Sequence, residues 1–572
     1  MITTFSYKNL RQNSKNKSLL IYVLLVLLFF IYQVNLPLTL IPIAGHDDGL
    51  YISMGRKIAE GDWLGTFNQF TLMKGIGLSI VLALLSIIKV PLPVFYVVLI
   101  ILTCELMRRA VVELWGHYYL ATALALLVMW YPGLDSTRIL RDTLLTWETV
   151  LAFSCFLWFA IHFSRDFIPR CRALNSLGLI LGYIFITREE GMTILLPVIV
   201  ITTALILYCR RNERQFSVRR KAAMIGIFVL CIVLPWILIC SINYLNYGKF
   251  IDNDFKESNF VKTLTLLQSI KSDNPIDFLP VPKDVRSKLY HGSPKFAELQ
   301  PYLDANNAPL SGWQKPPCER FKVTCGDYGG PWFFWALRDA VSLAGHYKSP
   351  LDASHYYHEL NREIQELCNS EKLTCNRKVL PLPQISSDQW QTLPIVLGAI
   401  MKNILLITPP PLYNMPSIGD EQQLRIAADF LGVKNFTPAV EKVEFNEAEK
   451  IDLKSQLHHL KVMASKELIL KLYSLFLPLL FLCGGLSAIA FLFTRPFLNV
   501  DTLILAMAWG LPISRILLLS ITTISGFGDI FHYYIGFSGP LLIVASMLSI
   551  LLLISRKSER SVVDKTLTAK VI

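Results

Sequence analysis

The sequence predicts an α-helical polytopic membrane protein, in which about ten spans and one juxtamembrane helix form a bundle and a mixed, mainly helical domain lies outside the membrane. Three observations support this fold class. Hydrophobic residues make up 53% of the 572 residues, aromatic residues make up 12%, and the mean hydropathy is +0.44. Soluble domains are typically less apolar, and aromatic residues gather at membrane interfaces. Many apolar segments are of spanning length, and one long hydrophilic region interrupts them.

The N-terminal part of the chain carries four basic residues, Lys8, Arg11, Lys15 and Lys17, before an apolar run at 19–41. This run is too long for the core of a signal peptide, and no small-residue cleavage site follows it. We therefore expect a retained anchor. Nine further segments have the length and composition of spans: 92–107, 114–131, 147–163, 174–187, 191–208, 222–243, 468–494, 500–524 and 537–555.

Residues 75–88 form an uninterrupted apolar run of only 14 residues between Lys74 and Lys89. A run this short is more typical of an interfacial or re-entrant helix than of a span. If it does not span, the strongly basic short loops, including the block from Arg210 to Lys221, all fall on one side. The positive-inside rule places that side in the cytoplasm. The sequence thus predicts ten spans, cytoplasmic termini and a surface helix at 75–88.

This topology divides the chain into three parts. Residues 1–243 form a transmembrane module with a first outer loop at 42–75, residues 244–466 form an extracytoplasmic domain, and residues 467–572 form a three-span segment with a cytoplasmic tail. The predicted location is the bacterial inner membrane with 244–466 in the periplasm, and an endoplasmic reticulum lumen would fit the same topology. Because the basic residues behind the net charge of +12 gather in short cytoplasmic loops, we expect the lipid bilayer as a partner and no nucleic acid.

Within 244–466, helical patterns occur at 332–347, 353–368, 422–431 and 441–460, and Pro/Gly-rich connections separate them. The segment 392–408 is apolar but short, and it contains Lys402. It is therefore predicted to be a packed or interfacial helix. If it spanned the membrane, the predicted sidedness of every later segment would fail.

Four of the 11 cysteines lie in the outer domain as two CxxxxxxC pairs, Cys318 with Cys325 and Cys368 with Cys375, and the other seven lie in or beside spans. An even number of cysteines in an exported domain predicts two disulfides, for which three connectivities are open. A zinc site is the alternative, although the spacing is wider than that of the usual CxxC knuckle.

The acidic pair Asp47-Asp48 lies where the first apolar segment ends and the outer loop begins. Leu50, Met54 and Ile58 then recur at helical spacing, which predicts a short amphipathic helix on the membrane surface. The N-cap of this helix explains one acid, whereas a second adjacent acid indicates chemistry. An enzyme that transfers a sugar from a lipid phosphate needs a carboxylate base and a nearby cation. Asp47 is therefore the candidate general base, and Asp48 is the second candidate catalytic residue.

The pattern Asp47-Asp48-x-x-Tyr51, followed by Gly61-Asp62-Trp63 and by Lys74 before a short apolar helix, resembles the first outer loop of GT-C glycosyltransferases. The similarity is to the protein O-mannosyltransferase and lipid A aminoarabinose transferase branch, and it covers roughly residues 15–245. It implies a GT-C-like transmembrane bundle, an acidic base, a polyprenyl-phosphate-linked sugar donor and inversion at the sugar. Two positions depart from the family pattern, because the second acid is Asp48 rather than Glu and Gly75 replaces a common Pro.

The resemblance also implies which cations hold the donor phosphate. Lys74 would bind it, and an interfacial lysine that only anchors its helix is the alternative. In the connection 133–142, Asp142 occupies the place of an acidic pocket residue of the family. Arg138 and Arg141 either meet the phosphate or pair locally with Asp142 to cap the following helix.

Two further groups of charges lie between or within apolar segments. Arg188, Glu189 and Glu190 form a tight turn similar to a Thr-Arg-x-x-Gly turn of the family, and their charges need outer water or a ligand. Arg188 is a further candidate to hold the donor phosphate. Arg515 lies within the 500–524 span, where an arginine faces a cavity or a partner. That partner is either a lipid-linked phosphate or an intramembrane carboxylate such as Glu148.

Tyr51, His532 and Tyr533 complete the set of candidate pocket residues, and the last two also fit an aromatic belt at the membrane interface. The acidic pair could hold Mg²⁺ or Mn²⁺ through few protein ligands and several waters, so either ion is a candidate cofactor. The sequence assigns no metal ligands beyond this.

Taken together, these features predict a cell-envelope glycosyltransferase that moves a sugar from a polyprenyl-phosphate donor to an extracytoplasmic acceptor, which is a glycan, a lipid or a protein. A transporter or flippase of lipid-linked sugars is one alternative, and it predicts paired repeats with broken helices at the midplane. The sequence contains no such repeat. A non-catalytic envelope scaffold is the other alternative, and it leaves the charges at the outer ends of the spans unexplained.

Overall fold

A computed structural model describes the chain except for residues 1, 44, 46, 134–136, 163–166, 213–217, 377–384, 411–415, 435, 438–452, 495–498, 527–531 and 569–572, and except for some further side chains within helices. In the described part the chain is helical without strands, and only two isolated β-bridges occur. The described part of the outer domain, which the sequence predicts to be mixed and mainly helical, consists of helices and connecting loops with the isolated bridge between Ile270 and Cys375.

A helix occupies each of the ten predicted span segments. In chain order these helices are α1 (Ile2–Val34), α4 (Leu92–Trp115), α5 (Tyr118–Met129), α6 (Arg141–Ile161), α7 (Phe167–Thr187), α8 (Met192–Asn212), α9 (Val218–Tyr247), α20 (Leu453–Leu492), α21 (Val500–Ile524) and α23 (Ser538–Thr568). Six of the described helices are long and apolar enough to cross a membrane, or seven if α4 and the helix bent against it count as one span. The chain is thus built as a multi-pass membrane protein, while the number of ten spans stays a prediction.

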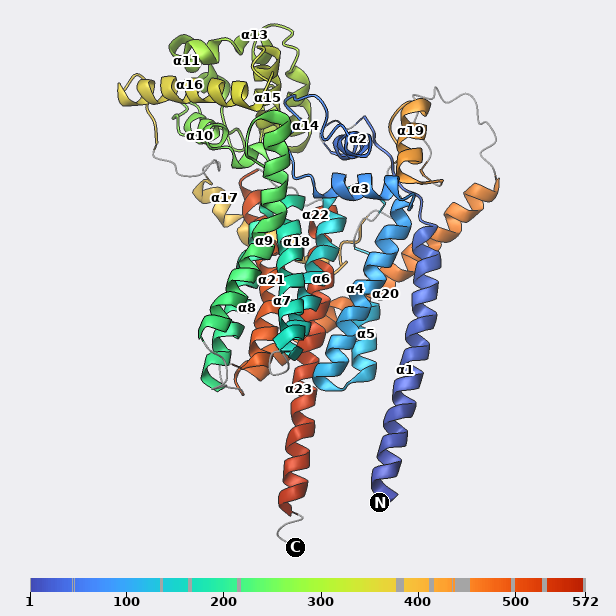
Figure 1. The fold of residues 1–572 in the computed structure, drawn as a ribbon. Coiled ribbons are helices and arrows are strands. Elements are labelled where there is room, and N and C mark those ends of the chain that lie inside the picture. The colour runs from blue at the N-terminus through green and yellow to red at the C-terminus, as the bar shows by residue number, and fades with distance from the viewer. Residues whose placement is uncertain are drawn as a thin grey trace.

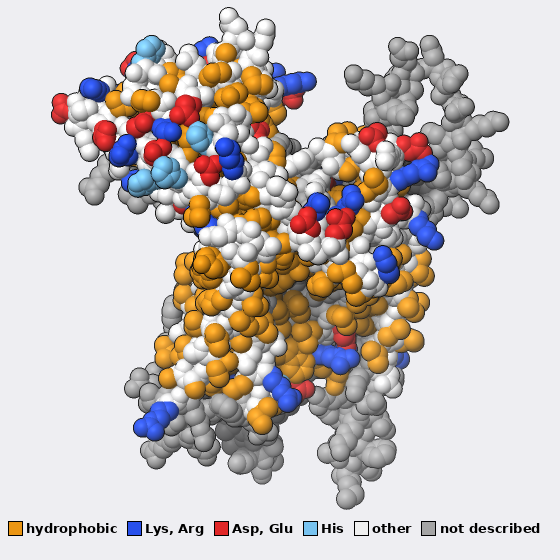
Figure 2. Space-filling model, turned by 45° about the horizontal axis from the view of Figure 1, so that its top comes forward, with side chains coloured by type: hydrophobic (Ala, Val, Ile, Leu, Met, Phe, Trp, Pro, Cys, Tyr) orange, Lys and Arg blue, Asp and Glu red, His pale blue; other side chains and the backbone are white. Residues whose placement is uncertain are grey.

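The surface of the molecule divides into an apolar body and a charged cap. Figure 2 shows hydrophobic side chains over the helix bundle and a concentration of Asp, Glu, Lys, Arg and His over the outer helices. In Figure 1 the N-terminal end of α1 and the C-terminal end of α23 both lie at the end of the bundle opposite these outer helices. This arrangement agrees with the predicted placement of both termini on one side.

Two helix boundaries differ from the prediction for local backbone reasons. The first helix ends at Val34, before 41, because Pro37 and Pro42 follow and proline lacks the N–H that a continuing helix needs. A break at Gly116 separates α4 from α5, where a φ of +72° gives the left-handed conformation typical of a helix C-terminus. As a result α5 has only 12 residues.

The apolar run at 75–88 forms α3 (Gly77–Ile87), an 11-residue helix that meets α4 at an angle of 112°. A helix of this length is roughly 16 Å long, about half the thickness of a bilayer core. It packs against α2 (Asp48–Ala59), the amphipathic helix predicted after the acidic pair. The bend agrees with the predicted surface helix, and it places α2 and α3 together across the outer end of the bundle (Figure 1).

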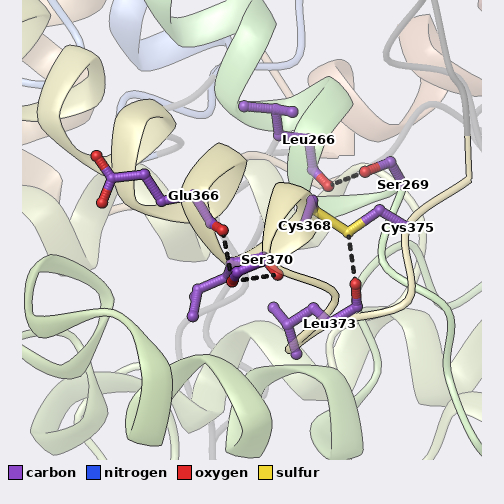
Figure 3. Close-up of a disulfide and its surroundings, with 8 residues drawn as sticks. Leu266, Ser269, Glu366, Cys368, Ser370, Leu373 and Cys375 are labelled. Atoms are coloured by element: carbon purple, nitrogen blue, oxygen red, sulfur yellow. Dashed lines mark hydrogen bonds between the residues drawn. A yellow bond between two sulfur atoms is a disulfide. The ribbon is translucent and has the colours of Figure 1, made fainter.

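The outer domain has its own hydrophobic core, which includes residues from Phe260 to Leu373. Its helices are α10 (Ser258–Leu267), α11 (Lys283–Gly292), α12 (Pro294–Ala297), α13 (Gln300–Leu303), α14 (Lys315–Arg320), α15 (Trp332–Leu343) and α16 (Pro350–Asn369). The last two match the predicted helices at 332–347 and 353–368. Cys318 lies within bonding distance of Cys325, and Cys368 within bonding distance of Cys375, so the connectivity is local. In Figure 3 the second pair joins the end of α16 to the segment after Leu373.

The remaining outer helices pack away from this core. After the short α17 (Ser387–Gln391), α18 (Leu393–Ile404) buries Ile400 and Ile404 against α21, as expected for a packed helix. The predicted helix at 422–431 is α19 (Glu421–Leu431), which lies against α2 and α3. Of the predicted helix at 441–460, residues 441–452 lie outside the described residues, and 453–460 form the start of α20.

Candidate active site

A cluster of ionised side chains lies where α2, α3, α6, α7 and α21 meet at the outer end of the bundle. It contains most of the charged candidates from the sequence, which come from five separate parts of the chain: Asp47, Asp48, Lys74, Arg138, Arg141, Asp142, Arg188, Glu189 and Arg515. The side chains of Glu190, His532 and Tyr533 lie outside the described part of the structure.

Asp47 precedes the first residue of α2 but does not cap this helix with its side chain. Its carboxylate accepts a hydrogen bond from the ammonium of Lys74 instead. The N-cap explanation for this acid is therefore wrong. The Asp47 side chain is 44% exposed, whereas that of Lys74 is 12% exposed. Lys74 Nζ also lies 5.6 Å from the ring centres of both Tyr51 and Trp335, within the range of cation–π attraction.

Asp48 is fully buried and is bound to the connection before α6. Arg138 Nη2 donates to its Oδ2 at 2.5 Å, and the backbone N–H of Ile139 donates to its Oδ1 at 3.3 Å. The pair ties the start of α2 to the start of α6. Arg138 thus forms its ion pair with Asp48, whereas the described ion pairs of Asp142 are with other arginines.

The two adjacent acids differ in their electrostatic environment. Burial acts to raise the pKa of Asp47, but the Lys74 ammonium together with Arg141 and Arg138 outweighs it and holds this pKa below its usual value. Burial raises the pKa of Asp48, and the opposing attraction of Arg138 does not cancel that effect. Asp47 is therefore the accessible member of the pair, and its ionised form is the more strongly favoured of the two.

Glu189, in the turn after α7, binds two other segments of the chain, the start of α6 and the residues before α3. It belongs to a short 3-10 helix, Glu189–Gly191, and its carboxylate accepts hydrogen bonds from Arg141 Nη1 at 2.7 and 2.8 Å. The backbone N–H of Gly75 donates to the same carboxylate at 2.6 Å. Arg141 also lies over the Tyr51 ring at 5.6 Å. Arg141 therefore pairs with Glu189, as Arg138 pairs with Asp48, so the alternative of a local pair with Asp142 that caps α6 is wrong.

Asp142 instead faces two arginines from distant helices. Arg188 donates to its Oδ1, and Arg515 Nη2 lies 3.7 Å from the same oxygen. Both arginines are buried, so the charge of Arg188 in the 187–191 turn does not simply reach water. Glu148, the other suggested partner of Arg515, accepts a hydrogen bond from the Thr187 hydroxyl at 3.0 Å. Among the described carboxylates, the one that pairs with Arg515 is that of Asp142, on α6.

Two glycines allow the outer loop to approach the turn after α7. A Cβ at Gly75 would lie 2.6 Å from the carbonyl oxygen of Ile186, and a Cβ at Gly77 would lie 2.3 Å from Thr187 Oγ1. Real Cβ atoms do not approach this closely, so any side chain would push the loop away. The departure from the family pattern at Gly75 also has a local explanation, because proline has no N–H to donate to Glu189.

We expect Gly75→Ala to destabilise the folded protein by about 1–3 kcal/mol, the usual cost of overpacking a close contact. The measurement is the apparent melting temperature of the purified protein in detergent. Gly226→Ala in α9 is the control, because nothing lies within 4 Å of its Cβ position. Equal melting temperatures for the two variants would contradict the close approach of the loop.

The sequence alone did not identify one aromatic member of the cluster, Trp335 of α15, which reaches Lys74 from the outer domain. Nothing in the sequence links Trp335 to the first outer loop. Tyr534 of α22 (His532–Ile535), which the sequence indicates together with His532 and Tyr533, has its ring centre 5.2 Å from the Arg188 guanidinium. Within the described residues no three His, Cys, Asp or Glu side chains form a group that could hold a metal ion.

Comparisons with known proteins give one structural similarity. No protein-family profile matches the chain, and no curated protein matches it. The apo crystal structure of ArnT from Cupriavidus metallidurans superposes with a TM-score of 0.31 and 12% sequence identity, covering 92% of this chain and 77% of that chain.

Proposed function

We propose that the chain is a membrane glycosyltransferase that moves a sugar from a polyprenyl-phosphate donor to an extracytoplasmic acceptor, with Asp47 as general base. The observation that carries this proposal is an accessible carboxylate paired with a lysine inside a dense group of charges. The described side chains of the cluster comprise five cations and four carboxylates. Such a group at the outer end of apolar helices is suited to an anionic, membrane-bound substrate.

We place the donor phosphate at Lys74. Of the five cations, Lys74 is the one that pairs with the half-exposed Asp47, so a ligand entering from the outer side meets this pair first. An aromatic cleft gives the polyprenyl chain a place near the cluster. The cleft lies at the outer ends of α1, α5 and α6, includes Thr137 next to Arg138, and is lined by Phe29, Tyr32, Trp130, Tyr131 and Trp147.

Binding of the phosphate prepares the base. When Lys74 turns to the phosphate oxygens, it leaves Asp47, and the loss of that cation raises the pKa of the carboxylate. Asp47 then accepts the proton of the acceptor hydroxyl or amine. The acceptor atom forms a bond to the anomeric carbon while the bond from that carbon to the phosphate oxygen breaks. Polyprenyl phosphate leaves with the electron pair, and the single displacement inverts the anomeric centre.

The remaining charges hold the geometry. Asp48 with Arg138, Glu189 with Arg141, and Asp142 with Arg188 and Arg515 connect the segments that carry Asp47 and Lys74. A transporter of inverted repeats has less support. One helix pair in the described residues, α3 with α4, is bent at a short break, and it has no counterpart in a second half.

The experiment is a comparison of cells with and without the chain by mass spectrometry of lipid-linked sugars and envelope glycans. We expect an acceptor that gains a hexose- or pentose-sized mass when the chain is present, together with loss of the corresponding polyprenyl-linked sugar. Lys74→Ala should suppress this gain. If the lipid-linked sugar changes sides of the membrane but no acceptor gains mass, the chain is a flippase and the proposal fails.

The pH dependence of transfer gives a separate test of the Asp47–Lys74 pair. Transfer needs ionised Asp47, so the rate falls as the pH drops through the pKa of this carboxylate. Lys74 holds that pKa low, whereas burial alone raises it. We therefore expect the acidic limb of the pH profile of kcat/KM, which reports the donor-free enzyme, to lie at higher pH for Lys74→Ala than for wild type, measured on its residual activity. A limb that stays in place would show that Lys74 does not set the ionisation of the base.

A further inference from the structure

A buried arginine of the outer domain holds the loop that carries Lys74. Arg338 of α15 is 1% exposed, and its Nε and Nη2 both donate to the backbone carbonyl of Gln69. Its Nη2 also donates to Asp254 Oδ2 at 2.7 Å. The guanidinium lies between the rings of Phe260 and Tyr347, at 5.2 and 5.0 Å. A planar guanidinium with several fixed donors is well suited to such a clamp.

Further contacts from the outer domain fix the residues directly before Lys74. The Gln69 amide donates to Asp339 Oδ1 at 3.1 Å and accepts from the Ser342 hydroxyl at 2.9 Å. The backbone N–H of Asp254 donates to the carbonyl of Leu72 at 2.8 Å. Leu72 and Met73 are fully buried. The loop is thus held at Gln69 and at Leu72. We call the three residues of α15 that bind Gln69, which are Arg338, Asp339 and Ser342, the α15 clamp.

The α15 clamp and the contact with Lys74 lie on one face of the same helix. Trp335 precedes Arg338 by three residues, so the two side chains are neighbours on the helix surface. The Trp335 ring lies 5.6 Å from Lys74 Nζ. In Figure 1 the loop between α2 and α3 reaches across to α15, which brings the outer domain onto the catalytic end of the bundle.

We propose that α15 positions Lys74 for the donor phosphate and that Arg338 is the positioning residue that acts through the Gln69 carbonyl. The inference rests on the proposed function, and it makes the outer domain part of the catalytic unit rather than an appended binding module. A displacement of about 1 Å at a reacting group can cost roughly 100-fold in rate. If the loop is loosened at Gln69, five residues before Lys74, the Lys74 side chain can shift by such a distance.

The test uses Arg338→Lys in the full-length protein in detergent. Lysine keeps the charge beside Asp254 but loses the fork that binds the Gln69 carbonyl. Gln69→Ala is the milder second variant, because it removes only the bonds to Asp339 and Ser342. Arg362→Ala is the matched control, since Arg362 also lies in the outer domain but is 68% exposed and pairs with Glu366 of its own helix.

Two measurements are made on each variant: hydrogen exchange of the backbone amides in 64–75, and affinity for undecaprenyl phosphate as the probe. We expect Arg338→Lys to speed exchange in 64–75 and to weaken probe binding, each by roughly 10-fold, with a smaller effect of Gln69→Ala and none of Arg362→Ala. The melting temperature of each variant identifies a loss of global folding.

The outcomes separate the inference from the function on which it rests. Unchanged exchange at 64–75 in both Arg338→Lys and Gln69→Ala overturns the α15 clamp. Faster exchange with unchanged probe affinity, while Lys74→Ala weakens that affinity, overturns the positioning role and leaves the proposed function intact. If Lys74→Ala also binds the probe like wild type, the donor site itself is wrong and the α15 clamp is only structural.

Discussion

Asp47→Asn is expected to reduce sugar transfer by about 10²- to 10⁴-fold, the usual contribution of a positioned general base. Asparagine has nearly the same shape as aspartate but cannot take the acceptor proton at neutral pH. The folded structure should tolerate the change, because the Asp47 side chain is 44% exposed and makes no helix cap. The measurement is the acceptor mass gained per folded protein in cells that express each variant.

Asp62→Asn is the matched control for this experiment. Asp62 lies in the same outer loop, is 61% exposed and faces Lys57 at 3.4 Å, so its substitution removes the same charge without touching the cluster. We expect transfer by Asp62→Asn to equal that of wild type. If Asp47→Asn also transfers at the wild-type rate, Asp47 is not the base and the transferase mechanism has to be abandoned.

Local patterns in the sequence predict much of the fold. Length and hydropathy locate a helix in each of the ten apolar segments, because a membrane span must satisfy its own backbone hydrogen bonds. The brevity of 75–88 and the placement of basic loops together predict that α3 does not continue into α4, which agrees with the bend of 112°. The break between α4 and α5 is expected between 107 and 114 but lies at Gly116, because one glycine within an apolar run does not by itself mark the end of a helix.

The partners inside the charged cluster could not be predicted in the same way. Sequence proximity suggests that Asp142 pairs with Arg138 or Arg141, yet its contacts are Arg188 and Arg515 from other helices. Direction explains this outcome, because Arg138 precedes α6, and the adjacent residues Arg141 and Asp142 point about 100° apart around the helix axis, toward different neighbours. Candidate residues can be recognised from charge at the end of a span, whereas their pairing depends on helix packing. The contact of Trp335 with Lys74 is an extreme case, because 261 residues separate them.

Removing one partner of the buried Arg138–Asp48 pair is expected to have the largest effect on stability. Arg138→Met leaves the carboxylate of Asp48, which is fully buried, with the Ile139 N–H as its remaining donor, at 3.3 Å. An uncompensated buried charge typically costs about 3–5 kcal/mol. We expect a loss of this size in the free energy of unfolding in detergent, and a similar loss for Asp48→Leu, which strands the arginine.

The double variant Arg138→Met/Asp48→Leu separates a structural pair from a catalytic one. Because both charges are then gone and apolar atoms fill the space, we expect it to lose much less stability than the sum of the two single variants. If Asp48 serves only to join α2 to α6, the double variant should also retain most of the transfer activity per folded protein, since Asp47 and Lys74 keep their contact. Recovery of stability without recovery of transfer would instead make Asp48 a second catalytic carboxylate. Additive losses of stability would contradict the buried ion pair itself.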